Sequence, residues 1–466
     1  MAIVQQVLTT AIICYNFVSM GILFTLPSST FVLFSSDNTT LDRIMTETEI
    51  SIMGSLSSAS PMIVMPFCGY VLDKIGRKRC LMLFTLPQVL GWMLLVIFNK
   101  VEAVICSMFM CGLSGPLYLV APVYINEYCE KSIRGSMTTY VLISYIVGTM
   151  VSYLMGGFLE YRAIAYSGLS ISIFGLAIEC FMKESPINLM MKGREEEAAE
   201  AVAFFKSCDV NSKEVIEEIG NIRRIISLDI EKIEAIPEEE KLRPQENKND
   251  KLSVWKYLIV SRSTRRALVI SMLLFVTCLS QGGVIVQMFA EPLFKVAVPN
   301  ISATLASVLF ALVSIAAGLY AAHLVERVGR RMLVIVASLL NGFCCAVLGT
   351  QLHFLWGPGW LTVVFMLVYA VNYTLGAGTI PNILVGEIFL PEIKSLATTF
   401  CTEWLFFVSF ILLYIFPLLL NKIGLGLIFF IFSGFSFAST IFSFIYVPET
   451  KGIEVDEIQR RFLKIK

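Results

Sequence analysis

The chain carries very little charge for its length. Only 15% of its 466 residues are Asp, Glu, Lys or Arg, whereas 56% are hydrophobic and the mean hydropathy is +0.75. A soluble protein of this size carries charge on about a quarter of its residues. Apolar runs recur along the chain, and each is long enough to cross a bilayer about 30 Å thick. The composition therefore predicts an all-α membrane protein with many spanning helices.

Other features are also missing, and each absence excludes a class of function. Histidine occurs only as His323 and His353, and no Cys-x-x-Cys spacing is present, so we expect no metal and no cofactor. The net charge is zero and no long basic tract exists, which argues against a nucleic-acid partner. We recognise no nucleophile–base pair and no Gly-rich phosphate loop, and therefore do not expect an enzyme. The twelve cysteines fall in predicted spans or cytosolic segments and are expected to be free thiols.

The most informative stretch runs from Gly69 to Arg79, between two apolar runs. It contains four cations within six positions, at 74, 77, 78 and 79. A cation in the hydrocarbon core costs ~3 kcal/mol, so this stretch is predicted to be a turn in water. Gly76 permits the sharp reversal of the backbone. Because Lys and Arg close to spanning segments mark the cytosolic side, the turn also orients the chain.

Apolar periodicity predicts twelve spanning helices. Their ranges are 8–34, 52–72, 80–98, 102–125, 136–158, 163–182, 267–290, 303–324, 332–352, 360–386, 396–420 and 424–446. Residues 1–183 then form a first six-helix half and residues 267–447 a second half. Residues 184–266, rich in Glu, Lys and Arg, are expected to be a cytosolic connecting loop with short helices and a disordered part from Pro237 to Asp250. Residues 448–466 form a cytosolic tail.

Loop charge supports one orientation in the membrane. Lys and Arg are more frequent in the loops that this topology places inside, and both termini are then cytoplasmic. The sequons at Asn38 and Asn300 fall in predicted outside loops and are candidates for glycosylation. The first 34 residues contain no charge, unlike the basic start of a signal peptide. We expect a multi-pass, monomeric protein of the plasma membrane.

The motif around the basic turn occurs again in the second half. Asp73-x-x-Gly-Arg77-Lys corresponds to Glu326-x-x-Gly-Arg330-Arg, and Glu127 and Glu184 correspond to Glu387 and Glu449 at nearly the same offset. This repetition indicates two homologous halves. Duplicated halves of this kind place a solute site near the membrane midplane and work by rocking about it.

Six motifs in order give the chain its resemblance to a known family. They are Gly69 to Arg79; Ala121-Pro-Val-Tyr-Ile-Asn-Glu127 leading to Arg134-Gly; Glu184-Ser-Pro with Lys192-Gly-Arg; Glu326 to Arg331; Gly376-x-Gly-x-x-Pro381 leading to Gly386-Glu-Ile-Phe; and Pro448-Glu-Thr-Lys-Gly452. The sequence resembles the sugar porter family of the major facilitator superfamily, and most of all insect facilitated trehalose and hexose transporters. The resemblance covers nearly the whole chain. It implies twelve helices in two pseudo-symmetric halves and facilitated transport of a sugar by alternating access.

Charged residues at the predicted cytosolic helix ends are candidates for a gate. They could form ion pairs between the halves when the cytosolic side is shut, or they could only anchor helix ends at the membrane surface. The candidate gating residues are Asp73, Arg77, Glu127, Arg134, Glu184, Glu326, Arg330, Glu387, Lys394 and Glu449.

The predicted solute site departs from the family pattern. Where the family has an amide side chain in helices 5 and 8, this chain has Leu142 and Ser314. The family's helix 10 tryptophan corresponds to Asn382, and the asparagine that ends its helix 7 pattern corresponds to Val284. Other polar and aromatic groups remain, each of which could instead be an interhelical hydrogen-bonding group. The candidate substrate-binding residues are Tyr145, Gln281, Gln287, Ser314, Tyr373, Thr374, Asn382, Glu403 and Trp404.

Two features of the sequence bear on whether transport is coupled to protons: the acid Glu403 within a span, and the absence of the charged pair found in proton-coupled sugar porters. An acid within a span is costly, which makes Glu403 a candidate for ligand or proton binding rather than packing. Proton-coupled sugar porters have an aspartate in helix 1 and an arginine in helix 4, but this chain has no acid before residue 35 and has Met108 at the arginine position. We therefore predict passive transport. Two alternatives stay open: a non-transporting sugar sensor or scaffold, and a carrier of a different small polar or cationic solute.

Overall fold

The computed structural model describes residues 2–37, 39–130, 132–234, 261–299, 301–389, 391–453 and 455–464. Three features predicted from the sequence lie outside these residues. They are the two sequon asparagines, Asn38 and Asn300, and the segment from Pro237 to Asp250.

The described residues of the first half form nine helices. They are α1 (Ala2–Phe24), α2 (Leu26–Phe34), α3 (Glu47–Ala59), α4 (Pro61–Ile75), α5 (Arg77–Ile97), α6 (Val101–Gly112), α7 (Leu117–Tyr128), α8 (Arg134–Phe158) and α9 (Tyr161–Glu179). Pro27 and Pro61 each lie in the first turn of a new helix, where a missing N–H costs nothing, so the spans that contain them are interrupted rather than ended. The connecting segment contributes α10 (Pro186–Met191), α11 (Glu195–Lys206) and α12 (Lys213–Glu234).

The second half is built in the same way. Its helices are α14 (Arg262–Leu279), α15 (Gly283–Met288), α16 (Ala290–Ala297), α17 (Ala303–Val328), α18 (Arg330–Phe354), α19 (Gly359–Leu375), α20 (Ile380–Ile388) and α21 (Pro391–Tyr446), followed by α22 (Val455–Lys464) in the tail. Gly424, at φ 77°, breaks α21 into two crossings. Gly282, at φ 92°, separates α14 from α15.

The number of membrane crossings agrees with the sequence. Within the described residues, ten helical stretches are long and apolar enough to span a bilayer, and the longest of them, Leu396–Tyr446, contains the Gly424 break. The broken segment α14–α16 supplies the remaining crossing between the connecting segment and α17. The described residues therefore form the predicted twelve crossings, although helix 7 is not the single helix expected over 267–290.

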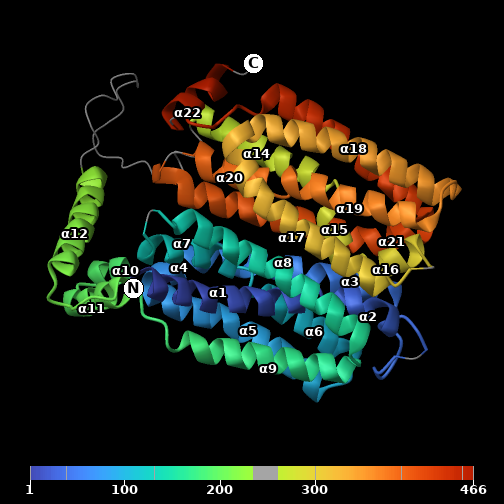
Figure 1. Ribbon diagram of the computed structural model, residues 1–466, viewed down its shortest axis with the longest axis horizontal. Helices are drawn as coiled ribbons and strands as arrows, with labels where there is room; N and C mark the ends of the chain where they lie inside the picture. Colours follow the sequence, from blue (N-terminus) through green and yellow to red (C-terminus); the bar gives the residue numbers. More distant parts are fainter. Residues whose placement is uncertain are drawn as a thin grey trace.

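The two halves lie side by side, one drawn in blue to blue-green and the other in yellow-green to red (Figure 1). The buried apolar side chains of the first half form a core that extends into α11 and α12, whereas those of the second half form two separate clusters. The first and second halves are residues 1–183 and 267–447, and these boundaries remain predictions.

Helices α10 and α11 are attached to the first half. The amide of Gln6 in α1 donates to the carbonyl of Phe205 at 3.3 Å, and the Tyr128 and Phe205 rings stack with centroids 4.8 Å apart. In the second half, α22 packs on α14 and α20. Helices α10, α11 and α22 lie at one end of the bundle, at the left of Figure 1. We call it the basic end, because Arg77 and Arg330 lie there, and the other end the opposite end.

Candidate functional site

At the basic end of the first half, Arg77 is the centre of a buried charged cluster. Its guanidinium lies 2.8 Å from Glu127 Oε1 and donates to Asn188 Oδ1 at 3.0 Å, while Asp73 is 3.6 Å away. The Arg77 side chain is only 6% exposed and that of Glu127 11%. The cluster joins α4, α5, α7 and α10, and within it the buried Arg77 and Glu127 compensate each other away from water.

Glu184 binds the backbone of the same turn. Its Oε1 accepts hydrogen bonds from the N–H groups of Arg77 at 2.8 Å, Lys78 at 3.2 Å and Ser185 at 2.9 Å. The first N–H groups of a helix have no partner within the helix. Glu184 therefore caps the start of α5 from a distant part of the sequence, and its negative charge lies at the positive end of the helix dipole.

The second half repeats this arrangement around Arg330. The guanidinium lies 2.8 Å from Glu387 Oε1 and 2.9 Å from Glu326 Oε1. Glu449 accepts from the N–H groups of Arg330 at 3.0 Å and Arg331 at 3.2 Å, as Glu184 does in the first half. Thr450 adds a bond of 2.5 Å to Glu387 Oε2. The duplication predicted from the sequence is thus also seen in the contacts, since each arginine pairs with an equivalent glutamate and each turn is capped by an equivalent carboxylate.

The caps have an electrostatic consequence at Glu449. Burial alone raises the pKa of this carboxyl, but hydrogen bonds from the backbone N–H groups of residues 451, 330, 331 and 450 outweigh it and hold the pKa below its usual value of 4.5. The carboxylate form is therefore the one that the fold stabilises.

Both turns depend on a glycine. Gly76 has φ 101° and Gly329 has φ 94°, a region that residues with a Cβ rarely adopt. A Cβ at Gly76 would lie 2.5 Å from Glu184 Oε2, and one at Gly329 would lie 2.6 Å from Glu449 Oε2. The two glycines thus allow the capping carboxylates to approach the backbone.

Eight of the ten candidate gating residues lie in these two clusters, four in each half. The bonds described above join Arg77 and Arg330 to carboxylates of their own half, so the ion pairs expected between the halves are not the ones formed in this structure. Arg134 donates to the carbonyl of Cys129 at 3.1 Å, and Lys394 is exposed. A bridge between the halves remains a prediction for another conformation.

The two halves meet near the opposite end. Tyr153 in α8 donates to the carbonyl of Gln287 at 2.6 Å, and the Gln287 amide donates to Thr149 at 3.0 Å. The N–H of Glu291 donates to Ser28 at 3.0 Å. Aromatic packing continues the contact, with the rings of Phe31 and Phe289 5.9 Å apart. Hydrogen bonds therefore join the halves at this end in the conformation described.

Gln281 is a packing residue in this conformation. It is fully buried. Its side-chain amide donates to Ser338 at 3.1 Å and accepts from Asn341 at 3.1 Å, while its backbone carbonyl accepts from Tyr369 at 2.9 Å. All of these partners lie in the second half. The interhelical alternative therefore describes the Gln281 side chain better than a solute contact does.

The remaining candidate residues differ in their surroundings. Gln287 is half-buried between the halves, Ser314 donates to the carbonyl of Phe310 at 2.8 Å, and Asn382 is exposed. The rings of Tyr145 and Tyr118 pack edge to face at 5.7 Å. Tyr373 and Thr374 are half-buried near the end of α19.

Glu403 and Trp404 lie on the spanning part of α21. Trp404 donates to the carbonyl of Met272 at 3.1 Å, which fixes the indole against α14. Glu403 is half-buried, and its carboxyl forms no hydrogen bond or ion pair with any group among the described residues. A carboxyl within a span and without a protein partner remains available to a solute or a proton.

A buried acid that was not predicted from the sequence lies in the first half. Glu179, 2% exposed at the end of α9, accepts from Asn16 at 2.9 Å and from Thr85 at 3.0 Å. Gln88, also on α5, is fully buried with neither amide atom paired within the described part of the chain. The sequence signal that could have identified Glu179 is its position as an acid at the end of an apolar run, five residues before Glu184.

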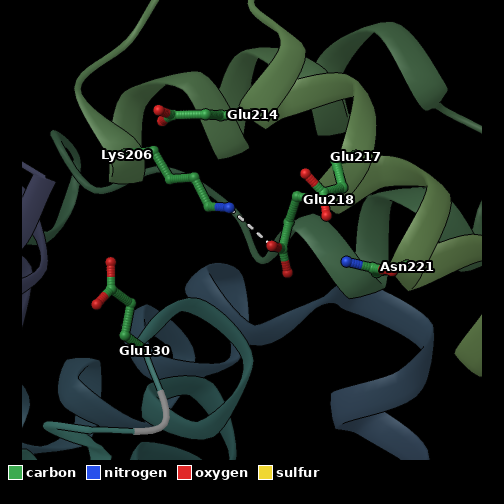
Figure 2. Close-up of a pocket in the computed structure, with 6 residues that line it drawn as sticks. All are labelled: Glu130, Lys206, Glu214, Glu217, Glu218 and Asn221. Carbon is green, nitrogen blue, oxygen red and sulfur yellow. Dashed lines mark hydrogen bonds and ion pairs between the residues drawn. The ribbon is translucent and has the colours of Figure 1, made fainter.

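A pocket of about 250 Å³ lies where α12 approaches the first half. Figure 2 shows its six lining residues, with the ion pair between Lys206 and Glu218 at 2.7 Å. The remaining lining residues are Glu130, Glu214, Glu217 and Asn221. Because all six side chains are charged or amide-bearing, the pocket lacks the apolar body that a ligand site usually has.

The fold and the paired clusters define a class. Two pseudo-symmetric helical halves, joined by a charged segment and carrying the same charged turn at one end, are the architecture of a major facilitator transporter. The family model described as "Sugar (and other) transporter" matches residues 1–462. The chain therefore belongs to this sugar transporter family.

Proteins similar in sequence or structure to this chain are also named as sugar transporters. The chain is 24% identical over 431 residues to the facilitated trehalose transporter Tret1 of Bombyx mori, covering 91% of this chain and 81% of that protein. It is 26% identical over 432 residues to Tret1 of Apis mellifera ligustica, covering 91% and 82%. Among solved structures, the inward open conformation of the xylose transporter XylE from E. coli superposes with a TM-score of 0.76 at 17% identity, covering 97% of this chain and 98% of that one. The last likeness supports the fold.

Proposed function

We propose that this protein moves a sugar, a hexose or a trehalose-like disaccharide, across the membrane by facilitated diffusion and alternating access. One observation carries the proposal: the halves are bonded to each other at the opposite end, whereas the charged clusters at the basic end are each bonded within their own half. Such an arrangement is expected of one of two alternating conformations.

The second conformation would reverse this pattern. Opening the opposite end requires breaking the bonds of Gln287 with Tyr153 and Thr149, each worth about 1 kcal/mol. Contacts between the halves at the basic end would replace them. A difference of a few kcal/mol between two conformations permits both to be populated during transport.

Glu403 is the residue on which we expect solute binding to depend. A sugar replaces its hydration shell with hydrogen bonds from protein groups, and a carboxylate without a protein partner is a strong acceptor for hydroxyls. Trp404 places an aromatic group next to it on the same helix. Gln287, half-buried between the halves, is the second polar group that a conformational change would release.

The coupling that we propose is passive. The helix 1 acid and the helix 4 arginine of proton-coupled relatives are absent, and Met108, at the arginine position, is fully buried in the apolar core of the first half. We further propose that the basic end faces the cytosol, that the protein is a monomer of the plasma membrane, and that both termini are cytoplasmic. The excess of Lys and Arg at that end supports this orientation.

The test is uptake of labelled glucose and labelled trehalose by transporter-deficient cells that express the chain. We expect saturable uptake of one of the two sugars, unaffected by a protonophore, and at least tenfold lower in Glu403→Gln. Glu160→Gln, an exposed acid at the opposite end, is the matched control and should transport like the parent. Uptake that collapses with the protonophore contradicts passive coupling, and a Glu403→Gln variant with parental uptake contradicts the role of this residue.

The buried amide of Gln281 favours a second candidate function. The Gln281 amide is bonded within the second half, and Leu142 replaces the amide residue that the family has in helix 5. The site therefore offers fewer amide groups to a sugar than the family pattern does. A carrier of a different small polar or cationic solute would use Glu403 as counter-charge. Equal uptake of glucose and trehalose in expressing and control cells, together with Glu403-dependent uptake of a cationic solute, would favour this candidate. Absence of uptake for every solute tried would favour a sensor or scaffold.

A further inference from the structure

A second pocket, of about 440 Å³, lies at the basic end of the first half, between the start of α5 and the segment from the end of α9 to α11. Five cations line it, at positions 78, 79, 183, 192 and 194, together with the acids Glu184 and Glu197. Apolar side chains complete the lining, among them Met82 and Met182. The pocket therefore combines an excess of positive charge with apolar surface.

The two acids of the pocket are already paired. Glu184 Oε1 accepts three backbone N–H groups at the start of α5 and at Ser185. Glu197 accepts from the guanidinium of Arg194 at 2.7 Å. These carboxylates are therefore not available to neutralise the other cations.

Two of the cations have no partner. Within the residues that the structure describes, neither the Arg79 guanidinium nor the Lys192 ammonium forms a hydrogen bond or an ion pair. The Lys78 ammonium, by contrast, donates to the carbonyl of Cys180 at 2.6 Å. Unpaired cations in one pocket are suited to an anion with several acceptor oxygens.

The pocket continues into the lipid-facing surface. On α5, Arg79 shares a helical face with Leu83 and Leu86, which are 45% and 42% exposed within a spanning segment. On the neighbouring α9, Phe174 is 56% exposed, and Phe181, just beyond the helix, is 82% exposed. An anion bound at Arg79 could therefore carry apolar chains that lie along both helices.

The second half does not repeat this feature. Arg331, the counterpart of Lys78, donates to the carbonyl of Phe444 at 2.6 Å. The counterpart of Arg79 is Met332, which is 52% exposed. The fold of the charged turn thus does not require a cation at the Arg79 position.

We propose that this pocket binds the phosphate-bearing headgroup of an anionic membrane phospholipid, with its acyl chains along Leu83 and Phe181. Arg79 and Lys192 bind the phosphate oxygens, and the apolar lining contacts the glycerol and the first methylenes. The site concerns the lipid boundary of the first half and does not depend on which solute the protein carries.

The experiment is native mass spectrometry of the detergent-purified full chain with phosphatidylinositol phosphate, using phosphatidylcholine as the neutral reference. The variant combines Arg79→Met with Lys192→Gln. Methionine is chosen at position 79 because Met332 is the counterpart of Arg79 in the second half. Because each cation near an anionic lipid contributes about fivefold in affinity, binding should weaken about 25-fold. The double variant Arg162→Gln with Lys422→Gln, exposed cations of the opposite end, should bind like the parent.

Other outcomes overturn the proposal. Binding of the phosphatidylinositol phosphate by the Arg79→Met, Lys192→Gln variant at parental affinity excludes this pocket. Displacement of the lipid by an equal concentration of soluble inositol phosphate excludes a lipid as the occupant. If the double variant does not fold, Lys192→Gln alone changes only an exposed side chain and should weaken binding about fivefold, and an unchanged affinity again excludes the pocket.

Discussion

Removing the negative charge of Glu127 should destabilise the protein more than removing that of Glu387, although the two carboxylates hold equivalent positions. Glu127→Gln leaves the Arg77 guanidinium, 6% exposed, without its carboxylate at 2.8 Å. The next carboxylate, Asp73, is 3.6 Å away and 73% exposed, so water screens it. A buried charge that loses its partner in this way costs about 3 kcal/mol.

The matched change in the second half is milder. In Glu387→Gln, the Arg330 guanidinium keeps a direct hydrogen bond to Glu326 Oε1 at 2.9 Å, although the Glu326 side chain is 69% exposed, whereas Asp73 lies 3.6 Å from Arg77. The Glu387 side chain is also 30% exposed, compared with 11% for Glu127, so its pair is partly screened by water already. A pair of this kind contributes about 1 kcal/mol.

Thermal unfolding with a thiol-reactive dye measures this difference, because Cys68 and Cys80 are fully buried and become reactive on unfolding. On a scale of about 2 °C per kcal/mol for large proteins, the midpoint should fall by about 6 °C in Glu127→Gln and about 2 °C in Glu387→Gln. The exposed Glu160→Gln should leave it unchanged. Equal shifts, or a larger shift in Glu387→Gln, would refute the role assigned to burial.

Three further predictions concern the turns and the second-half core. Since the folded pKa of Glu449 is lowered, its carboxylate contributes stability that is complete above pH 4.5 and is lost as the pH falls through that lower value. The unfolding midpoint of the parent should therefore drop on acidification below pH 4.5, and this drop should be smaller in Glu449→Gln. Gly76→Ala should cost about 1–3 kcal/mol from backbone strain, whereas Gly69→Ala, in open space within α4, should be neutral or stabilising in the same melting assay. Gln281→Leu should lower the midpoint by about 2–4 °C, because it removes the two buried hydrogen bonds of the Gln281 side chain, with Asn341 and Ser338, and a parental KM for uptake would confirm that Gln281 does not bind solute.

The crossings and the duplicated turns were predictable because their physical cause acts locally. A charge within hydrocarbon is costly, so the cations around Arg77 and Arg330 mark the ends of helices wherever they occur. The repeat also predicted which carboxylates correspond, but not that Arg77 pairs with Glu127 and Arg330 with Glu387 inside each half. The sequence could not predict the capping by Glu184, because that contact joins residues more than 100 positions apart at 2.8 Å.

The interruption of helix 7 has a cause that only the fold reveals. A Cβ at Gly282 would lie 2.3 Å from the ring of Phe432, and one at Gly283 would lie 2.0 Å from the ring of Tyr373. Two large rings from α21 and α19 therefore pack directly on the backbone between α14 and α15. In the sequence, this pair of glycines reads only as a locally weak helix within an apolar run.

The polar residues within spans show why a solute site is harder to predict than a fold. Glu179 and Glu403 are both acids in apolar stretches, and hydropathy treats them alike. Asn16 and Thr85 donate to Glu179, so its carboxyl is held by the first half itself. Glu403 has no such donor among the described residues. The cost of placing an acid in a span is therefore offset by protein hydrogen bonds at Glu179, whereas no described group offsets it at Glu403. That contrast in partners, rather than the residue type, is what distinguishes a structural acid from a candidate binding group.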